Sequence, residues 1–153
     1  MLGQLLYALH VLGAVLWVGG MAFALLALRP ALAELEPPAR LVLYEGALRR
    51  FFLIVWHAMP ALLLTGWALL FFWYGGFRGA GWHIHLMHTT GLVMAGVFAA
   101  LFFGPFRAFR AARAAGDLPG AAVNAERVRR LVTVNFALGL LTVAVAAWGR
   151  FGG

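Results

Sequence analysis

The chain has 153 residues, of which 64% are apolar and only 11% are charged, and its mean hydropathy is +0.90. A soluble domain is about half apolar and about a quarter charged, so this composition excludes an ordinary soluble protein. The net charge of +7 comes from twelve arginines. Because ten of these lie in two short segments between apolar runs, the charge points to a membrane surface and excludes a nucleic acid partner.

Four charge-free runs are each long enough to cross a hydrocarbon core, which needs about 20 residues. We therefore predict an all-α integral membrane protein, an antiparallel four-helix bundle that forms one domain over residues 1–153. The expected spans are about 3–28, 51–74, 82–106 and 131–149.

Prolines and glycines are expected to set the limits of these spans. Proline disfavours the helical conformation in the residue before it, so the first span should end at Pro30 and the third near Pro105. The glycine-rich stretch 75–81 predicts a tight turn, which makes the second and third spans antiparallel neighbours.

The arginines predict the orientation. Ten lie in the connections between spans one and two and between spans three and four, whereas Arg78 and Arg150 alone lie at the opposite end. Short loops rich in arginine stay in the cytoplasm, so both termini should face outward. All five acids share the arginine-rich connections, where we expect structural i,i+3 and i,i+4 ion pairs.

Histidines are the main candidates for function. Ionisable groups inside a membrane are energetically costly, so their presence there indicates a functional role. At about 1.5 Å per residue, His10, His88 and His85 lie roughly 9, 8 and 12 Å to the outer side of the membrane centre. His57 lies roughly 8 Å to the inner side and cannot share one small site with His10. We expect His57 to bond the carbonyl that Pro60 frees. The chain has five histidines in all: His10, His57, His83, His85 and His88.

The depths of these residues predict a haem site in the outer half of the bundle. Spans one and three are diagonal in a sequential bundle, so their core-facing side chains meet across its interior. Two imidazoles that hold one haem iron have their nitrogens about 4 Å apart. His10, paired with either His85 or His88, matches this requirement in depth.

Small and basic residues extend the haem hypothesis. Gly13 and Gly91 lie on the same helix faces as the histidines and would leave room for the ring, and Arg78 and Arg150 would meet its propionates. The main prediction is thus a protein that binds haem b and transfers electrons to or from a quinol, an oxygen species or a small periplasmic partner. Whether it is an enzyme, a membrane oxidoreductase, is left open.

The alternative is a copper site formed by His83, His85, Met87 and His88, because imidazole and thioether both suit copper. His57 is a further alternate metal ligand. In this hypothesis the bundle passes or senses copper without redox turnover. Polar residues are sparse in the inner half, so conduction would require a homo-oligomer. Without a metal, His83 is expected to be solvated at the membrane interface.

A family resemblance bears on this choice. Leu9–Met21 contains a His-x6-Trp-x-Gly-Gly spacing that resembles the first span of the copper-resistance D (CopD) family of bacterial inner-membrane proteins. Segments 81–87 and 127–135 resemble the short, stand-alone members. The resemblance implies a multi-pass inner-membrane protein with a role in copper uptake. It favours His10 and His85 as family-typical positions.

A second similarity involves segment 48–60 and the pair Gly66 and Trp67, which resemble the HemJ-type protoporphyrinogen oxidases. Those proteins also begin with a histidine-bearing first span and bind haem. This resemblance implies a third function, that of a protoporphyrinogen-oxidase-like enzyme.

The arginine distribution yields a topology prediction. A reporter that is active only in the periplasm should be active when fused after Gly153 and inactive when inserted at Gly116, because the two sites lie on opposite sides of the membrane in the predicted orientation. Activity of the Gly116 insertion together with silence of the Gly153 fusion would reverse the orientation.

Overall fold

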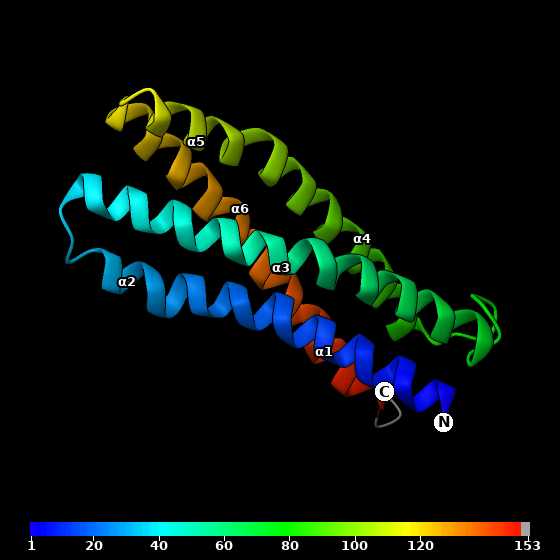
Figure 1. Ribbon diagram of the computed structural model, residues 1–153. Coiled ribbons are helices and arrows are strands. Elements are labelled where there is room, and N and C mark those ends of the chain that lie inside the picture. The colour runs from blue at the N-terminus through cyan, green and yellow to red at the C-terminus, as the bar shows by residue number, and fades with distance from the viewer. Residues whose placement is uncertain (151–153) are drawn as a thin grey trace.

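Four long helices make up almost all of the structure, a computed structural model in which residues 1–150 are described (Figure 1). Each helix is long and apolar enough to cross a membrane: Leu2–Leu32, Pro37–Phe72, Trp82–Ala114 and Leu118–Arg150. The described residues contain no strand. The predicted all-α membrane bundle is therefore confirmed.

Two of the four helices contain a wider, π-helical turn. The first helix comprises α1 (Leu2–Phe23), the π turn η1 (Ala24–Leu28) and α2 (Arg29–Leu32). The third comprises α4 (Trp82–Leu101), the π turn η2 (Phe102–Phe106) and α5 (Arg107–Ala114). The second and fourth are α3 (Pro37–Phe72) and α6 (Leu118–Arg150).

The π turns explain why the predicted ends at Pro30 and Pro105 are wrong. Both helices continue, to Leu32 and to Ala114, and Arg29 keeps helical angles (φ −62°, ψ −46°) although a proline follows it. In an α-helix a proline ring clashes with the carbonyl four residues earlier. A π turn immediately before or around the proline widens the helix at that carbonyl, so the chain accommodates the ring without leaving the helix.

Consecutive helices run in opposite directions, which gives the bundle two distinct ends (Figure 1). The N-terminus, the last turn of α6 and the connection 73–81 lie at one end, together with four of the five histidines. We call this the histidine end. The short connections 33–36 and 115–117 lie at the other, the arginine end.

The helices are associated as two pairs. α1 packs along α3, and α4 along α6, with closely spaced backbones, whereas the backbones of α3 and α4 approach each other at few positions, and these two helices meet through large rings such as Phe52, Trp56 and Phe98. Large aromatic side chains therefore fill the wider space between the two pairs.

The apolar core is concentrated from the middle of the bundle to the arginine end. Phe52 lies at its centre, with Phe98 and Phe106 edge-on at centroid distances of 5.6 and 4.8 Å. The largest side chains with almost no exposure are Trp17, Met21, Leu48, Phe52, Val55, Leu101, Phe106, Phe109 and Val128.

The histidine half is held together by polar contacts. The Asn135 amide, only 2% exposed, donates to the Met94 carbonyl at 3.1 Å, and the Thr142 hydroxyl donates to that of Thr90 at 2.7 Å. Both bonds join α6 to α4. Such interhelical hydrogen bonds are a common means of helix association in membranes.

The position of the core yields a stability prediction. Phe52→Ala should lower the free energy of unfolding by about 2 kcal/mol, because it leaves a cavity between well-packed rings. The loss is smaller than in the core of a soluble protein, because a side chain released from this core meets apolar lipid and not water. Thermal unfolding in detergent would measure the change. Phe72→Ala on the same helix is the control, since Phe72 is 83% exposed and Phe52 only 1%. Equal effects of the two variants would contradict the packing described here.

Candidate functional site

Two histidines at the histidine end lie together on one face of α4. His85 and His88 are three residues apart, a spacing that places side chains side by side on a helix. Phe77, in the connection between α3 and α4, contacts both rings: it stacks on His85 at 5.8 Å and meets His88 edge-on at 5.2 Å. This histidine pair, His85 and His88, is the candidate site.

The two imidazoles of the histidine pair differ in their hydrogen bonding. The Trp67 indole N–H donates to Nδ1 of His88 at 3.3 Å, which places the proton of the neutral ring on Nε2. His85 is exposed, and within residues 1–150 neither of its ring nitrogens forms a hydrogen bond. A ligand can therefore reach His85 directly, whereas binding to His88 must displace the Trp67 bond.

The other members of the expected copper cluster lie elsewhere on α4. The ring of His83 packs against Gly149 of α6, where any side chain would overlap it, and its Nδ1 is buried without a partner among the described residues. The expectation that His83 is merely solvated is therefore wrong. Met87 follows His83 by four residues and shares its face, away from His85.

His10 belongs to the interface between α1 and α3. Its Nδ1 donates to the Leu62 carbonyl at 3.0 Å and lies 3.3 Å from the Thr65 hydroxyl. Gly66 provides the space for the ring, since a Cβ there would lie 3.0 Å from the ring's Cε1. His88 instead contacts Trp67. His10 and His88 thus touch different faces of α3, because successive residues of a helix point about 100° apart.

The glycines expected to line a haem have other neighbours. Gly13 is buried against α3, where a Cβ would lie 3.3 Å from the Ala58 carbonyl oxygen, so it serves close packing of α1 on α3. Gly91 is buried beside Leu63. Arg78 and Arg150, expected to meet propionates, are both exposed.

His57 lies alone on α3. It is exposed, and its Nδ1 donates to the Leu53 carbonyl of its own helix at 2.8 Å. The expected partner, the carbonyl freed by Pro60, is therefore not the one that it uses. Among the described residues no three of the histidines and acids come close enough to hold a metal ion.

Two glutamates form ion pairs with arginines at the arginine end. Glu126 forms the predicted i,i+3 and i,i+4 pairs with Arg129 and Arg130. Glu45 of α3 is only 8% exposed and binds the guanidinium groups of Arg110 and Arg113, which come from α5. The latter contacts span 65 and more residues of sequence and have no local pattern, so the sequence does not reveal them.

Comparison with known proteins identifies the family. A model of the family described as copper resistance protein D (CopD) matches residues 45–149. The chain belongs to the CopD family. The match includes the histidine pair, His57 and His83, whereas Leu9–Met21, with His10, precedes it. The similarity to HemJ-type oxidases is not shown by the comparisons, and no curated protein and no solved structure matches this CopD-family chain.

The Glu45 ion pairs lead to a second stability prediction. Glu45→Gln should destabilise the protein by about 2 kcal/mol, because it leaves two guanidinium groups without their buried carboxylate. Thermal unfolding provides the measurement. Glu34→Gln is the matched control: Glu34 is exposed and forms no ion pair within residues 1–150. A Glu45 variant as stable as the Glu34 variant would show that these pairs contribute nothing.

Proposed function

We propose that this CopD-family membrane protein binds copper at its histidine end through His85 and His88. The observation that carries the proposal is the shared face of these two imidazoles on α4, around Phe77, inside the segment that matches the family. Imidazole is a favoured ligand of copper, and one helical turn between two histidines suits binding of one ion by both.

The position of the pair supports capture of copper from the side that the termini face. From the positive-inside rule we infer that this side is the periplasm. His85 is exposed and would make the first contact. His88, half-buried beside Trp67, would complete the site after the indole N–H has been displaced.

The packing of the bundle favours binding over conduction through a single copy. From its middle to the arginine end the bundle is filled by the aromatic side chains of Trp17, Phe52, Phe98 and Phe106. Copper would find few polar ligands along such a path, which a conducting pore requires. Transfer across the bilayer would therefore need a route between copies, and the homo-oligomer stays a prediction.

The haem hypothesis stays a prediction with less support. It needs His10 and one of the paired histidines within reach of one iron, yet they contact different faces of α3. His10 also lies outside the segment that matches the family. Electron transfer to or from a quinol or a periplasmic redox partner depends on haem, so it also stays a prediction with less support.

Metal binding by purified, untagged protein tests the proposal. Titration with copper(I) under ascorbate, followed by elemental analysis, should give about one copper per chain, a stoichiometry expected for two ligands on one ion. The double variant His85→Ala/His88→Ala should lose this binding. His83→Ala and His57→Ala, which alter histidines on other faces, should retain it.

Two results would overturn the proposal. One is stoichiometric copper binding that survives loss of both His85 and His88. The other is near-equimolar iron with the absorption spectrum of a porphyrin in protein from haem-replete cells, lost in His10→Ala, which would establish the haem function instead.

The Trp67 bond gives a sharper prediction. Copper that binds Nδ1 of His88 displaces the indole N–H of Trp67. Copper that binds Nε2 leaves the ring proton on Nδ1, where it faces the same indole N–H and cannot accept a hydrogen bond from it. Either way the bond is lost. Since a neutral hydrogen bond contributes about 0.5–1.5 kcal/mol, Trp67→Phe should tighten copper binding about two- to tenfold. Trp73→Phe, an exposed tryptophan at the same end, should leave the affinity unchanged. Weaker binding by Trp67→Phe would contradict the competition.

A further inference from the structure

A groove of about 340 Å³ opens between α3 and the third helix at the arginine end. One part of its wall is apolar and is formed by Leu53 and Trp56 of α3 and by Phe102 of η2. The groove lies where the backbones of α3 and the third helix approach each other at few positions, unlike those of the closely packed pairs α1–α3 and α4–α6. Leu53 is 61% exposed, so the groove is open to the lipid side of the bundle.

Aromatic rings give this groove a rigid wall. Trp56 meets Phe102 edge-on with 5.3 Å between ring centroids, and a further ring of η2, Phe106, is 1% exposed and anchored in the core. The wall is therefore fixed by the core behind it. A slender apolar chain, such as the acyl chain of a lipid, fits a groove of this size and chemistry.

Three arginines surround the mouth of the groove: Arg49 and Arg50 from α3 and Arg110 from α5. Within residues 1–150 neither Arg49 nor Arg50 has an acidic partner; Arg50 donates only to the Gly46 carbonyl at 3.1 Å. Arg110 lies 3.4 Å from Glu45, whose carboxylate also binds Arg113. The mouth thus has an excess of positive charge directly beside an apolar slot.

We propose that this groove is a binding site for one anionic phospholipid. The phosphate contacts Arg49, Arg50 and Arg110, because guanidinium groups bind phosphate oxygens with paired, charge-assisted hydrogen bonds. One acyl chain lies along Leu53, Trp56 and Phe102. A zwitterionic lipid offers the same chain but no net negative charge, so the site should discriminate between the two by headgroup.

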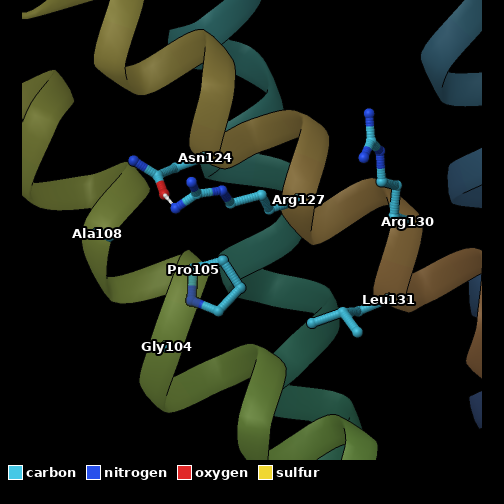
Figure 2. Close-up of a pocket in the computed structure, with 7 residues that line it drawn as sticks. All are labelled: Gly104, Pro105, Ala108, Asn124, Arg127, Arg130 and Leu131. Atoms are coloured by element: carbon cyan, nitrogen blue, oxygen red, sulfur yellow. Dashed lines mark hydrogen bonds between the residues drawn. The ribbon is translucent and has the colours of Figure 1, made fainter.

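A second groove, between α5 and α6, shows what is particular to the first (Figure 2). Its volume is about 650 Å³, and Gly104, Pro105 and Ala108 form its floor in place of aromatic rings. In Figure 2 the side chain of Arg127 extends toward Asn124, whereas Arg130 extends away from Pro105.

The charge of this second groove is also more dispersed. Arg127 donates to the Asn124 side chain at 3.4 Å, and Arg130 is paired with Glu126 at 3.4 Å. Its two guanidinium groups diverge, and one of them has an acidic partner. The second groove therefore serves as a matched control with the same number of arginines to remove.

Fluorescence quenching in nanodiscs tests the proposal with the full chain. Discs of phosphatidylcholine contain a small, equal fraction of either dibrominated phosphatidylglycerol or dibrominated phosphatidylcholine, since brominated acyl chains quench nearby indoles. The signal of Trp56 is the difference between the parent protein and Trp56→Phe. We expect Trp56 to be quenched at least about twofold more by the anionic lipid, as a selective site concentrates that lipid beside its wall.

Paired charge variants locate the effect. Arg49→Gln/Arg50→Gln should abolish the preference for the anionic lipid, whereas Arg127→Gln/Arg130→Gln, which removes the same charge, should retain it. Arg110 is left in place because it also binds Glu45. If the first double variant does not fold, as judged by circular dichroism, Arg49→Ala and Arg50→Ala singly replace it, and each should reduce the preference.

Three results would overturn the proposal: equal quenching of Trp56 by the two lipids, a preference that survives loss of Arg49 and Arg50, or equal loss of preference in both double variants, which would reflect overall charge and not a site. Copper binding at the opposite end should be unaffected by all of these variants, so the outcome is independent of the proposed function.

Discussion

Helix association in this protein depends on close contact and polar bonds, since the surrounding lipid is as apolar as any core and gives little reason to bury an apolar face. The chain concentrates such contacts in two pairs. Gly13 lets α1 approach the backbone of α3, and Asn135 joins α6 to the Met94 carbonyl of α4. Because the close contacts lie within the pairs α1–α3 and α4–α6, the space between the two pairs is wider. Between α3 and the third helix an arginine-lined groove opens at one end, and at the other end Phe77, in the connection 73–81, contacts the histidine pair.

Much of the fold is predictable from the sequence because each helix that crosses the bilayer requires a long run of residues without charge. Four such runs predict four helices, and the structure has four. The helix ends at Pro30 and Pro105 could not be predicted by the same reasoning. A rule about proline concerns one residue and its neighbours, whereas accommodation of the ring depends on a π turn spread over five residues, η1 or η2, whose sequences contain no sign of it.

The candidate site was predictable in part. The three-residue spacing along one helix identifies His85 and His88 as neighbours, whereas the two-residue step from His83 to His85 places His83 on another face. Depth in the membrane also follows from residue number, which led to His10 as a haem ligand at the level of His88. Depth says nothing of direction around the helix axis, however. His10 turns toward Leu62 of α3, and only tertiary packing decides that. For the same reason the binding of Glu45 to arginines of α5 has no sequence signal.

The π turn η2 has a consequence for the electrostatics of the arginine end. A π turn contains one residue more than an α turn, so every side chain after it is rotated by about 100° from its position in an unbroken α-helix. Arg110 and Arg113 follow η2 and point at Glu45 in this rotated frame. Conversion of η2 into a regular α-helix at unchanged length would swing both guanidinium groups off the carboxylate, although neither arginine had been altered, whereas deletion of one residue from η2 would remove the extra residue and leave both arginines facing Glu45. The π conformation of this segment therefore sets the direction in which the arginines after it point.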